Sequence, residues 1–158
     1  MELTYRKATI GDLELLVRTR IKVLRCANQL PDTADLAVVE AQSRIYYINS
    51  LGPAHVAYLV FDGNVLAGCG GASFYQVMPT CMNPSGKKAY IMNMYTEPDY
   101  RRRGIAWKTL DLLVNEARSR GVVFITLEAT NMGRPLYEKY GFIAMDDEMI
   151  LPFDLPLY

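Results

Sequence analysis

The sequence predicts a mixed α/β fold in a single domain, with an antiparallel first half and one β-α-β crossover. The chain has 158 residues, about one ordinary domain, so residues 1–158 are expected to form one unit. Hydrophobic residues make up 51% of it, enough to bury a core without disulfides or metals. The apolar residues follow helical spacing at first, then form β-branched and aromatic runs, and return to helical spacing after residue 104.

The first third predicts a short strand and two helices. Residues 3–6 alternate as a strand, and Thr9 followed by Asp12 resembles a capping box at the start of a helix. That helix continues to about residue 25, with apolar residues at helical spacing at Ile10, Leu13, Val17, Ile21 and Leu24. A break at residues 28–33 precedes a second helix over about residues 35–50.

The middle of the chain predicts three strands. Residues 55–61 and 65–75 are separated by the Asp-Gly-Asn sequence of residues 62–64, a strong hairpin signal. Glycines, which mark a bulge or a close backbone approach, occur in the second strand at Gly68, Gly70 and Gly71. A loop at residues 78–86 leads to the third strand at residues 88–96.

The last third predicts the crossover and the end of the sheet. An amphipathic helix begins near Ile105 and ends at Gly121, which favours a helix C-terminus. A strand follows at residues 122–128, and then a short helix over about residues 134–140. Residues 149–151 are apolar and predict a final strand.

Charge and cysteine usage exclude several classes of protein. Lys plus Arg and Asp plus Glu both number 17, so no nucleic-acid partner is expected. The three cysteines, Cys26, Cys69 and Cys81, cannot all form disulfides, which favours a location in the reducing cytoplasm. Cys69 is expected in a buried strand and Cys81 in a loop. The longest apolar runs are about 5 to 7 residues, short of the ~20 that span a bilayer. The polar N-terminus is not a secretory signal, so no membrane partner is expected.

The single histidine, His55, limits metal and hydrolase chemistry. One histidine and three dispersed cysteines make a zinc site almost impossible, so no metal is expected. A Ser-His-Asp triad would require His55 itself as the base. A histidine at the edge of a strand, just after Gly52-Pro53, is expected to be solvated instead.

A basic turn between a strand and a helix predicts an anion site. The strand that ends at Thr96 and the helix near Ile105 are joined by a turn that contains three arginines and Gly104. Such a junction offers unpaired N–H groups and the positive end of the helix dipole, which suit a pyrophosphate. Neither GxxxxGK[ST] nor GxGxxG is present, and a solvated basic turn is the alternative.

Two segments around this turn resemble one family. Residues 94–106 resemble the acyl-CoA-binding segment of the GNAT N-acetyltransferase superfamily, whose Arg/Gln-x-x-Gly-x-Gly/Ala signature is met by Arg101, Gly104 and Ala106. Residues 136–142, Leu-Tyr-Glu-Lys-Tyr-Gly-Phe, resemble a second block of that family. The resemblance covers essentially the whole chain. It implies a central mixed, mostly antiparallel sheet of six to seven strands, splayed in the middle and flanked by about four helices.

The resemblance also implies acetyl-CoA as co-substrate and a set of residues that hold it. Backbone groups of Met94 and Thr96 would contact the pantetheine arm, which adds to the exposed strand edge. Asn131 lies at about the place where relatives contact the cofactor. The N–H groups of the turn would hold the pyrophosphate at Arg101, Arg102, Arg103, Gly104, Ile105 and Ala106.

The implied reaction moves an acetyl group from a thioester directly to an amine. Only a neutral amine attacks, and an amine with a pKa near 10.4 is protonated at neutral pH. In the family, the tyrosine at the position of Tyr137 donates to the departing thiolate. The alternative is a tyrosine that packs under the cofactor.

The general base is less determined. Histone-type relatives carry a glutamate at about the position of Tyr90, and residues 90–96 contain no carboxylate. Glu128, at the end of the next strand, is the candidate. A water chain through Asn93 or backbone carbonyls is the alternative, and Glu97 belongs to the turn.

For the acceptor, the sequence predicts only a class of substrate. The loops around the cleft carry no acidic cluster of the kind that an aminoglycoside or polyamine site would favour. The resemblance implies an amine of a small molecule or a protein as the acceptor. The aromatic and apolar candidates to line the acceptor pocket, or else to form core, are Tyr46, Tyr47, Phe74, Tyr75 and Met78. Two other functions remain open, namely a catalytically impaired acyl-CoA-binding module and an interaction domain without such a site. Relatives are often dimers, and the apolar tail at residues 151–158 would either pack across a homodimer interface or close over its own sheet.

Overall fold

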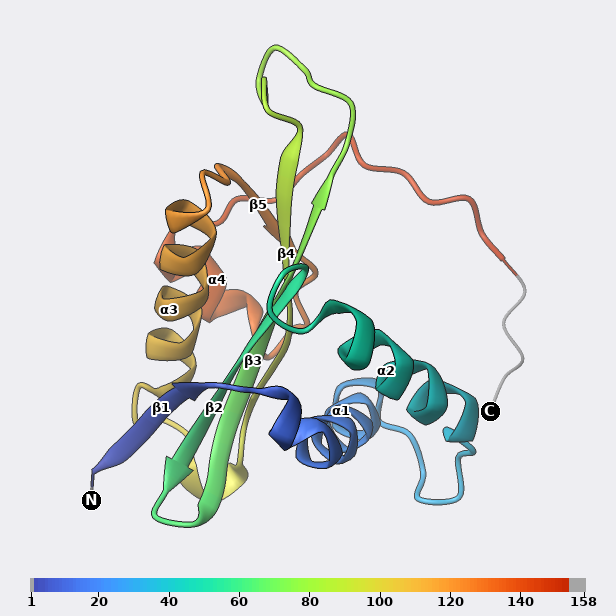
Figure 1. Ribbon diagram of the computed structural model, residues 1–158, viewed down its shortest axis with the longest axis vertical. Coiled ribbons are helices and arrows are strands. Elements are labelled where there is room, and N and C mark those ends of the chain that lie inside the picture. The colour runs from blue at the N-terminus through green and yellow to red at the C-terminus, as the bar shows by residue number, and fades with distance from the viewer. Residues whose placement is uncertain (1, 154–158) are drawn as a thin grey trace.

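A five-stranded mixed sheet forms the middle of the molecule in the computed structural model, which describes residues 2–153 (Figure 1). In spatial order, its strands are β1 (Leu3–Lys7), β2 (His55–Asp62), β3 (Val65–Gln76), β4 (Lys87–Thr96) and β5 (Phe124–Leu127). The first four pair antiparallel, and β5 pairs parallel with β4 across the predicted crossover.

The strand count is a correction to the expected six to seven. Residues 149–151, predicted as a final strand, pair with no other strand in the structure. The segment bends at Asp146 and Asp147, but no glycine or asparagine follows to support a tight turn back onto β5. Met149 and Leu151 therefore remain 94% and 89% exposed. Of the tail at residues 151–158, positions 154–158 lie outside the described residues.

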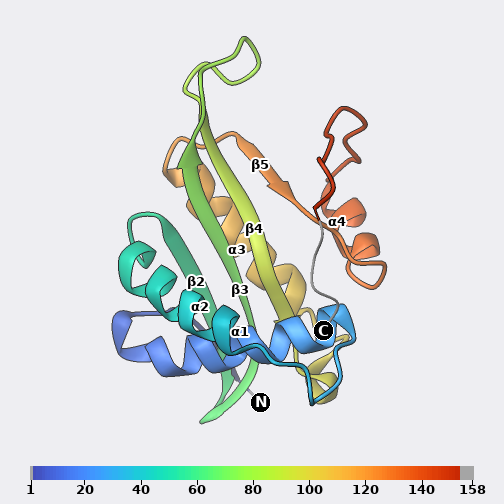
Figure 2. The same ribbon diagram turned by 90° about the vertical axis from the view of Figure 1, so that its right-hand side faces the viewer.

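The helices cover the two faces of the sheet. They are α1 (Leu13–Asn28), α2 (Ala37–Ser50), α3 (Ile105–Ser119) and α4 (Arg134–Tyr140). Figures 1 and 2 place α1 and α2 on one side and α3 and α4 on the other. Two short 3-10 turns precede α1 and α3, Ile10–Asp12 and Pro98–Tyr100. Within residues 2–153, no helix is long and apolar enough to span a membrane.

The capping box predicted at Thr9 and Asp12 is confirmed. Thr9 N donates to Asp12 Oδ2 at 2.8 Å, and Arg6 holds the same carboxylate in an ion pair. These contacts lower the pKa of Asp12 to about 2, first through Arg6 and then through Thr9. The chain therefore passes from β1 into α1 through the single 3-10 turn Ile10–Asp12.

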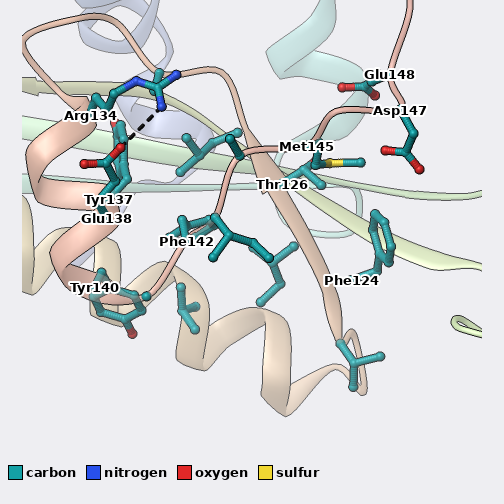
Figure 3. A pocket seen from close by; sticks show the side chains of 18 of the residues that line it. Phe124, Thr126, Arg134, Tyr137, Glu138, Tyr140, Phe142, Met145, Asp147 and Glu148 are labelled. Atoms are coloured by element: carbon teal, nitrogen blue, oxygen red, sulfur yellow. Dashed lines mark hydrogen bonds and ion pairs between the residues drawn. The ribbon is translucent and has the colours of Figure 1, made fainter.

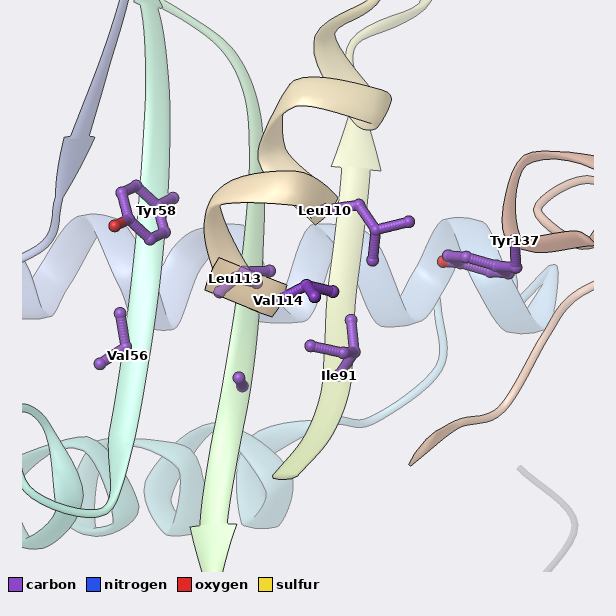
Figure 4. Close-up of a cluster of buried hydrophobic side chains, with 8 residues drawn as sticks. Val56, Tyr58, Ile91, Leu110, Leu113, Val114 and Tyr137 are labelled. Carbon is purple, nitrogen blue, oxygen red and sulfur yellow. The ribbon is translucent and has the colours of Figure 1, made fainter. Parts of the chain in front are cut away.

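The core has one part on each face of the sheet. On the α3 face, Leu110, Leu113 and Val114 pack on Ile91 of β4 (Figure 4). On the α1 and α2 face, the buried residues are Leu16, Val17, Val23, Tyr47, Ala57, Leu59 and Cys69. Cys69 is thus a buried strand residue and Cys81 an exposed loop residue, as predicted.

The glycines of β3 let other groups approach closely, which confirms the interpretation of their pattern. A Cβ at Gly70 would lie 2.5 Å from Sδ of Met94 and 2.8 Å from Cγ2 of Thr109. A Cβ at Gly71 would lie 2.8 Å from Nε2 of His55. The first approach packs α3 against the sheet, and the second makes room for the imidazole on the opposite face.

The strands β4 and β5 part halfway along β4. Their last paired residues are Ile91 and Leu127, because β5 ends there while β4 continues to Thr96. Near this point the register of β3 and β4 shifts, and Asn93 has a φ of 58°. The edge of β4 beyond Ile91 is consequently without a strand partner, and the site is built around this opening.

Candidate active site

A cavity of about 420 Å³ lies along the unpaired part of β4. Its walls come from β4, the turn before α3, the loop after β5 and the start of α4. Of the residues expected to hold the cofactor, those that line it are Met94, Thr96, Arg101, Arg102, Gly104, Ile105 and Ala106. Arg103 and Asn131 are not among its lining residues; Thr130 and Met132, on either side of Asn131, are.

The turn before α3 has the geometry of an anion site. Arg102 and Gly104 both have left-handed φ values, 60° and 77°, so successive N–H groups curve around one point. Gly104 caps α3, with no side-chain hydrogen bond at the cap and no acidic residue in the first turn. The positive end of the helix is therefore uncompensated within the described chain, and a Cβ at Gly104 would meet nothing within 4 Å.

Thr96 adds a polar group to the wall of this cavity. Its Oγ1 is buried and has no hydrogen-bond partner within residues 2–153, while its carbonyl accepts a bond from Nε of Arg101 at 3.3 Å. A cavity with an open anion turn at one end and a strand edge along its side fits an elongated phosphate ester.

Tyr137 of α4 also lines this cavity. It lies in the first turn of α4, its side chain is 9% exposed, and it packs with Ile91 and Leu110. Figure 4 shows its hydroxyl directed toward β4. Burial raises the pKa of Tyr137, which keeps the phenol protonated at neutral pH. The ring packs and the hydroxyl faces the opening, so the two interpretations of this residue are compatible.

A second cavity, of about 760 Å³, lies beside the free edge of β5 (Figure 3). Tyr137 borders this cavity too, together with Thr126 of β5 and Glu148 of the segment after α4. Tyr137 therefore separates two spaces on either side of the point where β4 and β5 part.

Tyr90 and Glu128 meet on the α1 and α2 face of the sheet. Tyr90 pairs with Thr126, so Glu128 follows on the same face two residues later. The pKa of Tyr90 is raised to about 12, first by burial and then by the charge and hydrogen-bonding contact of Glu128. The position of the histone-type glutamate and the predicted base are thus neighbours.

Other carboxylates near the turn are already engaged or remote from the opening. Glu97 accepts a hydrogen bond from Tyr95 at 3.3 Å and forms an ion pair with Lys22. Asp99 lies in the 3-10 turn and is exposed. Within residues 2–153, no group of three or more His, Cys, Asp and Glu residues is arranged to hold a metal ion.

His55 is buried, so the expectation that it would be solvated is wrong. Its side chain is 2% exposed, with Nδ1 3.0 Å from Oη of Tyr46 and 3.2 Å from Oγ of Ser73. Burial, and secondarily the charge of Arg20, lower its pKa to about 4. The position at the start of a strand suggested exposure to solvent. In the structure, α2 covers this part of β2, and Gly71 leaves space for the imidazole ring.

Arg20, which the sequence did not single out, contacts the strand that borders the site. Its Nη1 donates to Oδ1 of Asn93 at 3.2 Å, which ties α1 to the irregular point of β4. The available signal was its place on α1, since Leu16, Val17 and Val23 are one helical turn away and all buried. An arginine in the middle of an apolar stripe requires an explanation.

Comparison with known proteins identifies this arrangement. A family model described as the acetyltransferase (GNAT) family matches residues 26–142. The crystal structure of a predicted acetyltransferase from Clostridium acetobutylicum, solved with acetyl-CoA, is 36% identical with a TM-score of 0.88, over 96% of each chain.

Two curated proteins match over shorter stretches. An uncharacterised N-acetyltransferase of Bacillus subtilis (strain 168) is 29% identical over 96 residues, 58% of each chain. The ribosomal protein bS18-alanine N-acetyltransferase of Salmonella typhimurium is 40% identical over 58 residues, 35% of this chain and 39% of that one. The match thus spans less than two thirds of either curated relative.

Proposed function

We propose that this chain, which belongs to the acetyltransferase (GNAT) family, transfers the acetyl group of acetyl-CoA directly to a primary amine. The observation that carries the proposal is the parting of β4 and β5 after Ile91. The cavity that ends at the anion turn, the Tyr137 hydroxyl and the Glu128–Tyr90 contact all border that opening. The acceptor is an amine of a small molecule or of a protein.

The residues of the cavity support acetyl-CoA as the co-substrate. The N–H groups from Arg101 to Ala106 hold the pyrophosphate at the start of α3, where no side chain caps the helix. Met94 and Thr96 present their backbone groups along the edge of β4 to the pantetheine amides. Arg103 and Asn131, each next in sequence to lining residues of the cavity, assist in binding the cofactor. When bound, acetyl-CoA supplies its acetyl group as a thioester, whose C–S bond breaks as the amine nitrogen bonds to the carbonyl carbon.

Glu128 takes the proton that the amine must lose. An amine with a pKa near 10.4 is protonated at pH 7, so it first loses one proton to solvent, and reaching this neutral form costs roughly 4 kcal/mol. Once the nitrogen bonds to the carbonyl carbon it becomes strongly acidic, so a carboxylate suffices to accept its proton. Tyr90 holds this carboxylate in place through the contact described above.

Tyr137 completes the exchange at the sulfur. Its hydroxyl, protonated at neutral pH, donates to the sulfur as negative charge develops there. A covalent acyl-enzyme on Cys69 is disfavoured because burial raises the pKa of that thiol to about 12. We place the reaction in the cytoplasm, because all three cysteines are free thiols.

Calorimetric titration of acetyl-CoA, with a matched pair of glycine variants, tests the cofactor site. Gly104 and Gly121 lie at the two ends of α3, both with positive φ and both with open space at Cβ. Wild type and Gly121→Glu are expected to bind with a micromolar Kd, about −8 kcal/mol. Gly104→Glu should lose binding through the clash and charge at the pyrophosphate position. Equal binding by both variants would refute this placement.

Release of free CoA thiol in the presence of a panel of amines tests the transfer itself. The wild type is expected to release thiol only when a primary amine is present, in a one-to-one ratio with acetylated amine. Tight binding of acetyl-CoA without release for any amine would instead indicate a binding module of the same fold.

A further inference from the structure

Arg20 carries a charge that the described protein does not neutralise. It lies on the buried stripe of α1, and its only side-chain hydrogen bond within residues 2–153, to Asn93, uses one of its five N–H donors. None of the ion pairs formed within residues 2–153 includes it. Placing a guanidinium in a partly buried position without an anion is costly.

The groups around Arg20 offer dipoles but no negative charge. Its electrostatic neighbours are Tyr47, Cys69, Tyr90 and His55. Burial raises the pKa of Tyr47 and Tyr90 to about 12, and that of Cys69 likewise, so these groups are neutral near pH 7. The imidazole of His55 is neutral for the opposite reason, a lowered pKa.

Arg20 and Glu128 lie close to the same point, where the paired part of the sheet ends. The last pair is Ile91 with Leu127; Glu128 is the next residue after Leu127, and Asn93, which holds Arg20, is two after Ile91. Tyr90 interacts with both charged groups. An unpaired cation and an exposed carboxylate therefore lie near the end of the β4–β5 pairing, where we place the transfer of the acetyl group.

We infer that the acceptor is an amine that also bears an anionic group, a carboxylate or a phosphate, and that Arg20 binds this group while Glu128 receives the amine. This inference rests on the proposed function. The anion accepts hydrogen bonds from the four remaining N–H donors of Arg20, and it supplies the negative charge that the described chain does not place beside this guanidinium. An amino-acid-like acceptor, with amine and anion a few bonds apart, matches this arrangement.

Steady-state kinetics with paired acceptors test the inference. One pair is an α-amino acid and its amide, and a second is an aminoalkyl phosphate and the corresponding amino alcohol, so the two pairs distinguish carboxylate from phosphate. The wild type is expected to prefer the anionic member of at least one pair by about 10–100-fold in kcat/KM. A wild type that uses the neutral members as well or better overturns the inference.

Variants separate binding of the anion from a purely structural role of Arg20. Arg20→Gln should lose about 10–100-fold in kcat/KM, mainly through KM, for the anionic acceptor and less than about 3-fold for the neutral one. Arg18→Gln, at an exposed position of the same helix, is the matched control. If Arg20 only supports Asn93, Asn93→Ala and Arg20→Gln would lower kcat equally for both acceptors, which contradicts the inference.

Failure of the inference remains distinguishable from failure of the proposed function. Loss of acetyl-CoA binding or of all transfer by the wild type would refute the function, whereas acetyl-CoA binding by Arg20→Gln should be unchanged. If no acceptor turns over, inorganic phosphate is added to the protein saturated with CoA, which occupies the anion turn. A phosphate-dependent rise in Tm in wild type and Arg18→Gln, absent in Arg20→Gln, supports the inference; no rise in wild type overturns it.

Discussion

Tyr137 lies directly against Gly133, where a Cβ would come within 3.0 Å of the ring atom Cε2. The backbone of Gly133, with φ −84° and ψ −27°, is open to any residue, so glycine is required here for space and not for conformation. The position of the Tyr137 hydroxyl at the opening therefore depends on a missing side chain four residues earlier.

Gly133→Ala is expected to move the Tyr137 ring by a few tenths of an ångström without unfolding α4. Displacement of the hydroxyl should reduce kcat about 3–10-fold. Stopped assays of thiol release and thermal unfolding of the same samples provide the measurement. Gly11→Ala is the control, because its Cβ would make only an ordinary 3.5 Å contact with Thr9. Equal kcat for both variants would show that the packing of Tyr137 does not position its hydroxyl.

Tyr137→Phe separates the hydroxyl from the ring. Within residues 2–153 the hydroxyl of Tyr137 has no hydrogen-bond partner, so its loss should change the free energy of unfolding by less than about 1 kcal/mol. Loss of the donor to the sulfur should lower kcat about 10–100-fold at unchanged Kd for acetyl-CoA.

Tyr140→Phe provides the opposite pattern as a control for Tyr137→Phe. Its hydroxyl donates to Asp111 at 2.8 Å, so the variant should lose about 1 kcal/mol of stability and retain kcat. Wild-type kcat in Tyr137→Phe would leave only the packing role for that residue.

Glu128→Gln keeps the shape of the side chain and removes the base. We expect kcat/KM to fall about 100-fold or more with acetyl-CoA binding intact, since proton transfer by a positioned side chain contributes that much. The measurement is kcat/KM for one amine across pH 6 to 9, where a rate limited by the free amine would recover at high pH. Glu97→Gln should keep its rate, because Lys22 and Tyr95 already engage that carboxylate. Equal rates in the two variants would favour a water chain.

Much of the fold was predictable because it depends on local chemistry. The capping box at Thr9, the hairpin at Gly63 and the helix end at Gly121 each act within a few residues, and the structure has them as predicted. The glycines of β3 were informative for the same reason, since the lack of a side chain is itself visible in the sequence.

The features that the sequence did not predict depend on contacts between segments that are distant in the chain. His55 is buried by α2 and by the space at Gly71, neither of which its own neighbours reveal. The final strand at residues 149–151 was overpredicted, because an apolar run shows strand preference but not whether the chain turns back to a partner. Arg20 was visible as a charge on an apolar stripe, but its meaning required Asn93, 73 positions away.

The stability of the protein should depend on pH through its single histidine. The pKa of His55 is about 4 in the folded protein and 6.5 in a model peptide, so the unfolded chain binds the extra proton first. The free energy of unfolding should therefore be constant above about pH 6.5 and fall as pH decreases toward 4, by about 3 kcal/mol in total. Urea unfolding at pH 7.5, 6, 5 and 4.5 measures this fall, and Asp12, with a pKa of about 2, titrates below the window. Because the chain has one imidazole, its NMR signal can be followed without ambiguity; a midpoint near 6.5 would contradict its burial.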